Sequence, residues 1–122
     1  MPFVEVFDFR ATAQQRETAT RKMTEALCDS YGIPQDIVSA YFIDVGRDGY
    51  GHDGVFAENA REKRIFVKLH AFRRSEAMRR AAAQSLTRAV VDAYGTTPES
   101  VAVYFLDREP DEVAHGGSLA SD

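Results

Sequence analysis

The sequence contains a single cysteine, Cys28, and no hydrophobic run long enough to span a membrane. One cysteine excludes an intrachain disulfide and a metal site built from cysteines, and we interpret Cys28 as a small buried group on a helix. The three histidines, His52, His70 and His115, are scattered without the spacing of metal ligands. No signal-peptide pattern is present, so we expect a cytoplasmic protein without a metal site.

Basic residues are also few. The 15 Lys and Arg residues are outnumbered by 19 Asp and Glu residues, which gives a net charge of −4 and a pI of about 5.4. This balance argues against nucleic acid as a main partner, and no polybasic segment suggests a membrane surface. The composition is otherwise that of an ordinary globular protein, and 122 residues predict one domain with a substantial core.

The chain repeats itself at an offset of 63 residues without a gap. Two unrelated segments rarely align over this length without an insertion, so the pattern indicates a duplicated and fused unit. We expect a single domain over 1–122, made of repeats at about 2–59 and 65–122 and joined by a charged linker over 58–64. Identical residues at this offset include Phe3 and Phe66, Phe9 and Phe72, Arg10 and Arg73, Arg16 and Arg79, Tyr31 and Tyr94, Gly32 and Gly95, Tyr41 and Tyr104, and Asp44 and Asp107.

Each repeat predicts a strand, a helix and a second strand. The first strand is rich in β-branched and aromatic residues and is compatible with burial on both faces. The helix has an N-cap hydroxyl at its start and a glycine where a left-handed residue should end it. A glycine-rich tail follows the second strand. The predicted strands are 3–9 and 65–72 followed by 38–44 and 101–107, the N-caps are Thr12 and Ser75, the C-terminal glycines are Gly32 and Gly95, and the tails are 46–54 and 114–117.

This order predicts an α+β fold, with two tandem β-α-β units forming a four-stranded sheet and two helices on one face. A strand–helix–strand crossover is right-handed and makes its two strands parallel. Two helices cannot hide the apolar residues of both sheet faces, among them Phe3, Val67, Tyr41 and Tyr104. The uncovered face therefore predicts self-association.

Pro2 is the most unusual feature of the first strand. If Met1 is removed, Pro2 becomes a free secondary amine at the start of a strand. Desolvation there penalises the charged ammonium, lowers its pKa and makes the neutral amine available as a catalytic base. The alternative is structural: Pro2 begins an edge strand, where its missing N–H does no harm.

Several short motifs resemble one family when they are taken with Pro2. The stretch 14–27 is similar to a helix of that family, Gly49–Gly54 (GYGHDG) to its glycine-aromatic-glycine hairpin, and His115–Ser121 (HGGSLAS) to its glycine-rich ending. The chain thus resembles the tautomerase superfamily, in particular a fused, double-length 4-oxalocrotonate tautomerase, over nearly its whole length. The resemblance implies the tautomerase fold and a homotrimer with the sheets packed inward.

The resemblance also implies an isomerase that needs no cofactor. In this family the N-terminal proline moves a proton alpha to a carbonyl, and arginines hold an anionic substrate. Pro2 matches the base, whereas its repeat partner Ile65 has no free amine, so the chain has one candidate catalytic proline. A guanidinium fork would hold a carboxylate and stabilise a developing enolate.

The candidate substrate-binding residues are Arg73, Arg74, Arg10, Tyr50 and Tyr104. Arg73 and Arg74 are favoured over Arg10 because fused relatives place such arginines in the second unit, although any one of the three is also compatible with a surface role. Tyr50 matches an aromatic residue of the site and is also compatible with hairpin packing. Tyr104 matches a tyrosine of dehalogenase relatives, but its copy Tyr41 suggests a structural role.

Some features of the family are missing. Ser39 and Ala102 stand where short members carry a second arginine, and Ala114 stands where a water-activating glutamate would be, with Asp36 and Glu112 as possible substitutes. We therefore expect a tautomerase acting on a small 2-hydroxydienoate or 2-oxo acid. The alternatives are a hydratase, dehalogenase or decarboxylase of a small unsaturated or β-keto acid, or a non-enzymatic ligand-binding or assembly domain.

Overall fold

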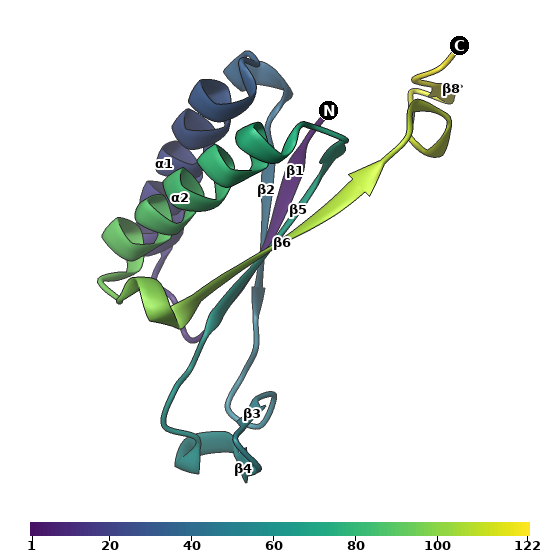
Figure 1. Cartoon of the computed structure of the whole chain (residues 1–122). Coiled ribbons are helices and arrows are strands. Elements are labelled where there is room, and N and C mark those ends of the chain that lie inside the picture. Colours follow the sequence, from purple (N-terminus) through teal and green to yellow (C-terminus); the bar gives the residue numbers. More distant parts are fainter.

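The computed structural model describes all 122 residues and consists of one layer of two helices against one sheet of four strands (Figure 1). Both repeats have the predicted order of strand, helix and strand, which confirms the α+β fold with two β-α-β units. Neither helix is long and apolar enough to cross a bilayer. The first repeat contains β1 (Phe3–Asp8), α1 (Ala13–Tyr31), the 3-10 helix η1 (Gln35–Ile37), β2 (Ser39–Asp44), β3 (Gly51–His52), β4 (Val55–Phe56) and η2 (Ala57–Asn59). The second contains β5 (Ile65–Phe72), α2 (Glu76–Tyr94), η3 (Pro98–Ser100), β6 (Val101–Arg108), η4 (Pro110–Glu112), β7 (Ala114–His115) and β8 (Ser118–Leu119).

The sheet has the strand order β2-β1-β5-β6. Within each repeat the two strands are parallel, and the repeats join through an antiparallel pair in which Phe3 of β1 lies opposite His70 of β5. This pairing gives the sheet two different ends. The proline end is our name for the end of the sheet at which β1 and β2 begin and at which β5 and β6 finish. The opposite end is called the distal end.

Burial alternates along β1 and β5, so only one face of each strand is buried. The residues on the other face of these strands are half-buried in the single chain. Side chains that point toward the helices, such as Val4, Val6 and Leu69, meet the apolar stripes of α1 and α2 in a single core. Because both repeats contribute to this core, each stabilises the other through burial of apolar surface.

The helices begin and end where the sequence predicted. Thr12 accepts a hydrogen bond from the backbone N–H of Gln15, whose side chain accepts one from the N–H of Thr12, a complete capping box. At α2, the Ser75 side chain accepts a hydrogen bond from the backbone N–H of Met78, but the reciprocal bond of a capping box is missing. Gly32 and Gly95 follow the helices with left-handed φ values of 64° and 66°, which cost glycine little.

Each glycine-rich tail forms a small two-stranded hairpin that stands away from the body (Figure 1). The hairpin β3–β4 extends from the distal end and β7–β8 from the proline end. The linker 58–64 is exposed, as its charge suggested, except at Ala60, which is almost fully buried next to the end of η2.

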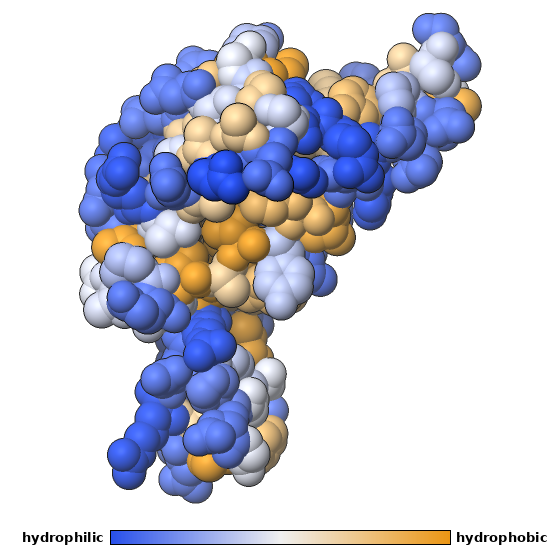
Figure 2. Space-filling view, in the orientation of Figure 1, coloured by the Kyte–Doolittle hydropathy of each residue, from blue (hydrophilic) through white to orange (hydrophobic).

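The face of the sheet opposite the helices has no cover of its own; we call it the open face. Phe7 stacks on Phe66 there, and Tyr41 and Tyr104 are 58% and 62% exposed. Figure 2 shows hydrophobic surface concentrated over the middle of the body, between the hydrophilic helix layer and the two largely hydrophilic hairpins. Of the apolar residues that the sequence analysis named, Tyr41 and Tyr104 are exposed in the single chain and Phe3 is half-buried, whereas Val67 lies in the core under the helices.

Candidate active site

Pro2 lies at the proline end, immediately before β1, and is buried. Its carbonyl oxygen accepts a hydrogen bond of 3.4 Å from the backbone N–H of Ser39 on β2. The antiparallel register that pairs Phe3 with His70 continues to place Pro2 beside Ala71 of β5. Pro2 is therefore held between two strands in a poorly hydrated position.

Two cavities meet at the N-terminus, and both are lined by Met1 and Phe3. The first, of about 400 Å³, lies between β5, the end of β6 and the C-terminal hairpin and is lined by His70, Ala71 and Arg108 among others. The second, of about 560 Å³, includes Pro2 itself and borders β2. Both cavities are largely apolar, as small-molecule sites usually are.

Arg73 and Arg74 follow the last residue of β5 and therefore lie at the proline end. Arg73 forms ion pairs with Asp107 at 3.3 Å and with Glu109 at 3.8 Å. Arg74 donates a hydrogen bond of 2.8 Å to the carbonyl of Phe72, and its guanidinium lies 4.7 Å from the centre of the Tyr31 ring. Two of the predicted arginines thus stand at the same end of the sheet as Pro2.

Two further arginines at this end were not predicted. Arg108, the last residue of β6, lines the first cavity, and Arg79 of α2 lies 3.4 Å from Asp107. Arg108 has Val45 as its repeat partner, so a search for charges present in one repeat alone would have found it. Arg73 and Arg79 are partly neutralised by Asp107 and Glu109, whereas Arg74 and Arg108 form no ion pair and are the cations at this end that an anion would meet.

Arg10 and Tyr50 lie at the distal end, away from Pro2 in the same chain. They line a separate cavity of about 330 Å³, in which Glu58 pairs with Arg47 at 3.1 Å and with Arg10 at 4.0 Å. The physical reason is the antiparallel pairing of β1 with β5. The end of β5 lies beside the start of β1 at the proline end, whereas the end of β1 lies at the distal end. The structure thus does not bring these two residues to Pro2.

Tyr104 is likewise outside both cavities next to Pro2. It lies halfway along β6 on the open face, opposite Lys68 and edge-on to Phe66, with ring centres 4.9 Å apart. Closer to Pro2 on the same face, His70 hydrogen-bonds Glu5 at 2.8 Å and stacks on Phe3, with ring centres 4.3 Å apart. His70 therefore has a paired, structural setting at the edge of the first cavity.

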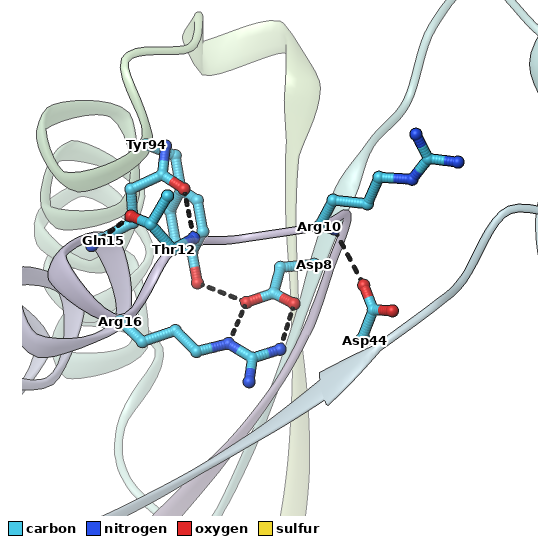
Figure 3. A network of polar contacts seen from close by, with 7 residues as sticks. All are labelled: Asp8, Arg10, Thr12, Gln15, Arg16, Asp44 and Tyr94. Carbon is cyan, nitrogen blue, oxygen red and sulfur yellow. Dashed lines mark hydrogen bonds and ion pairs between the residues drawn. The ribbon is translucent and has the colours of Figure 1, made fainter.

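The distal end contains a cluster of polar residues centred on Asp8 (Figure 3). Asp8 is fully buried, and its carboxylate accepts two hydrogen bonds from the Arg16 guanidinium, at 3.0 and 2.8 Å, and one from the Tyr94 hydroxyl, at 2.7 Å. Burial and the Asp8 carboxylate raise the pKa of Tyr94, and hydrogen bonding to Asp8 raises the pKa of Arg16. Every group in this cluster is paired, so its role is structural.

No protein-family model matches the chain, and no curated protein matches its sequence. Solved structures do match. Native fused 4-OT superposes with a TM-score of 0.91 at 19% identity, covering 98% of this chain and 96% of that one. A fused 4-OT solved as an asymmetric trimer gives 0.88 at 16% identity, with coverage of 98% and 96%. A member of the cis-3-chloroacrylic acid dehalogenase family gives 0.83 at 18% identity, with coverage of 96% and 82%. The chain therefore has the tautomerase fold of the fused 4-OT proteins, as the resemblance implied.

Proposed function

We propose that the chain is a cofactor-independent tautomerase in which Pro2, once Met1 is removed, is the general base. The substrate is a small 2-hydroxydienoate or 2-oxo acid, and the reaction moves a proton alpha to its carbonyl. The observation that carries this proposal is the convergence at the proline end. Pro2 is buried between two strands, two cavities flank it, and four arginines lie around the adjacent strand ends.

The base is a secondary amine that burial keeps neutral. Ionising the Pro2 nitrogen in this poorly hydrated position costs free energy, so its pKa falls below that of an exposed N-terminus. A neutral amine close to the operating pH is an effective general base. Met1 occupies the place where the two cavities meet, so its removal both frees the nitrogen and joins the cavities around it.

Arg73 and Arg74 hold the substrate carboxylate and stabilise negative charge as the enolate forms. Both follow β5 directly, and β5 is the strand beside Pro2. Guanidinium groups match a carboxylate in geometry and charge, and fixed charges near a developing anion lower the barrier. Arg10, Tyr50 and Tyr104 have no part in this single-chain arrangement.

We further propose that the active form is a homotrimer in the cytoplasm. Fused 4-OT structures include a symmetric and an asymmetric trimer, which supports an oligomeric assembly here. The open face offers Phe7, Phe66, Tyr41 and Tyr104 for burial against other copies. Packing of the open faces would cover apolar surface that the helices leave exposed.

The test combines intact mass with kinetics. Mass spectrometry of the purified chain should show loss of Met1, and the chain should ketonise phenylenolpyruvate or 2-hydroxymuconate. We expect Pro2→Ala to lose at least a hundredfold in kcat/KM, the typical contribution of a general base. Pro98→Ala, at the distal end, is the matched control. Activity that survives Pro2→Ala unchanged would overturn the mechanism, and inactivity on every enol acid would favour a ligand-binding domain.

Hydration or dehalogenation of a small unsaturated acid is the second candidate. It is favoured by one observation, that Glu112 lines the first cavity together with Arg108 and His115. A carboxylate at this position is able to activate a water molecule. Release of chloride from cis- or trans-3-chloroacrylate, lost in Glu112→Gln, would support this reaction over tautomerisation.

A further inference from the structure

The two ends of the sheet carry the same donors, but only one end carries the acceptor. At the distal end, Arg16 and Tyr94 together donate three hydrogen bonds to the carboxylate of Asp8. Their repeat partners at the offset of 63 are Arg79 and Tyr31, which lie at the proline end. The residue that corresponds to Asp8 is Ala71. The proline end thus has the arginine and the tyrosine of the cluster without its carboxylate.

The arginine and tyrosine donors at the proline end form fewer hydrogen bonds to carboxylates than their partners at the distal end. Tyr31 is 5% exposed, and its hydroxyl has no side-chain acceptor comparable to Asp8. Because no buried side-chain oxygen or nitrogen lacks a hydrogen-bond partner, this hydroxyl lies within reach of solvent. The only carboxylate beside Arg79 is Asp107, at 3.4 Å, and Asp107 is shared with Arg73. Around Tyr31 lie Arg74, Arg79 and Asp107, and burial raises the pKa of its phenol. Tyr31 is therefore a neutral hydrogen-bond donor at working pH.

We propose that the substrate carboxylate binds where the Asp8 carboxylate lies in the other repeat, between the Arg79 guanidinium and the Tyr31 hydroxyl. This inference rests on the proposed function and specifies its carboxylate subsite. Arg74 lies over the Tyr31 ring and Arg73 shares Asp107 with Arg79, so the two arginines proposed above border the same subsite. The Asp8 cluster shows how this fold holds a carboxylate, with two nitrogens of one arginine and one tyrosine hydroxyl. Ala71, the residue that corresponds to Asp8, supplies no carboxylate of its own.

The position of Ala71 connects this subsite to Pro2. Ala71 lies beside Pro2 in the register of β1 and β5, and it lines the first cavity. A carboxylate held over Ala71 is therefore next to the proposed base. In a 2-oxo acid the carbonyl adjoins the carboxyl group, so the proton alpha to that carbonyl would also lie near the base. An aspartate at this position would place a negative charge beside both the base and the incoming anion. Its absence from the second repeat is thus consistent with a binding role.

The decisive variant is Ala71→Asp, which copies the distal cluster into the proline end. We expect the variant to fold, because the first repeat accommodates the same three side chains. Its built-in carboxylate should occupy Arg79 and Tyr31. Binding of fumarate, a small dicarboxylate without an enol, should weaken at least tenfold by titration calorimetry. Gln84→Asp, which adds the same charge on the exposed side of α2 away from both cavities, is the control and should bind fumarate like the wild type.

A second pair of variants tests the subsite without relying on Ala71→Asp. Tyr31→Phe should weaken fumarate binding about tenfold, whereas Tyr94→Phe, the same change at the distal end, should leave it unchanged. Calorimetry needs no turnover, so a wild type that binds fumarate but converts no enol acid would refute the tautomerase and retain the subsite. No fumarate binding by the wild type at millimolar concentrations, or equal binding by all four variants, would overturn the subsite.

Discussion

The hydroxyl of Tyr94 lies 2.7 Å from Oδ2 of Asp8, and this hydrogen bond ties the last residue of α2 to the last residue of β1. It joins the two repeats at the distal end, on the side where the core meets solvent. Because Asp8 is fully buried, the bond also satisfies a carboxylate that has no access to water.

We predict that Asp8→Ala lowers the free energy of unfolding by about 3 kcal/mol, because it leaves the Arg16 guanidinium and the Tyr94 hydroxyl without their partner. Tyr94→Phe should cost about 1 kcal/mol. Asp92→Ala, which removes an exposed ion pair with Lys22 at 3.5 Å, is the control and should cost less than about 1 kcal/mol. Urea denaturation measures all three, and equal midpoints for Asp8→Ala and Asp92→Ala would contradict the role assigned to the cluster.

Stability should fall at alkaline pH through the two helix-terminal tyrosines. Burial raises the pKa values of Tyr94 and Tyr31 in the folded state, so above about pH 10 the unfolded chain releases protons that the folded chain retains. Their contribution is complete below pH 10 and decreases as the pH rises toward the folded-state values. Thermal denaturation between pH 9 and 11, in the wild type and in Tyr94→Phe, measures this slope. A slope as steep in the variant as in the wild type would exclude Tyr94 as a source.

The hairpin β3–β4 depends on Gly49. A Cβ built at this position would lie 2.0 Å from the carbonyl oxygen of Val45, a backbone atom that cannot yield without moving the chain. We expect Gly49→Ala to displace the hairpin and lower the thermal midpoint by several degrees. Gly51→Ala is the control, since its nearest neighbour, the Val55 oxygen, is 3.5 Å away. Proteolysis in the segment 46–58 should increase in Gly49→Ala alone.

Assembly should depend on the open face. Tyr104→Asp places a charge in the middle of this face and is expected to convert the proposed trimer to monomer, as seen by light scattering after gel filtration. Gln84→Asp adds the same charge on the exposed side of α2 and should leave the assembly intact. If both variants remain trimeric, the copies associate through another surface.

Arg108 offers a further test of the proposed site. A comparison of the two repeats would have singled out this residue, because its repeat partner is the uncharged Val45. It lines the first cavity beside Met1 and Ala71. Arg108→Ala should raise KM for an enol acid about tenfold, which corresponds to loss of about 1.4 kcal/mol of anion binding. Arg88→Ala, on the exposed side of α2, removes the same charge without touching the cavity. Equal KM values in the two variants would remove Arg108 from the site.

Most of the fold was predictable because its signals are local. The unbroken repeat, the capping residues Thr12 and Ser75, and the glycines at 32 and 95 all act within a few residues of chain, and the structure has them where the sequence indicated. The strand faces were harder. Aromatic residues at alternate positions, such as Phe3 and Phe7, made the first strand look buried on both faces. In the structure, Val4 and Val6 are the residues that β1 contributes to the hydrophobic core.

The site was only partly predictable, because it depends on how the two repeats join. In sequence, Arg10 and Arg73 are equivalent residues, and nothing local distinguishes them. Only the antiparallel pairing of β1 with β5 brings Arg73 to the end where Pro2 lies and leaves Arg10 at the other. The contrast between Asp8 and Ala71 was visible in the repeat alignment, but its meaning required knowing that Ala71 lies beside Pro2.

The difference between Asp8 and Ala71 has a consequence for having both units in one polypeptide. Two identical separate subunits would carry the same residue at the position of Asp8 and Ala71 at both ends of their shared sheet. An aspartate would bind the arginine and the tyrosine at both ends, and an alanine would leave both ends without that stabilising cluster. Gene fusion removes that constraint, since each copy evolves alone. In this molecule the first repeat holds the Asp8 cluster, and the second repeat has alanine at the equivalent position, where we propose that the substrate carboxylate binds.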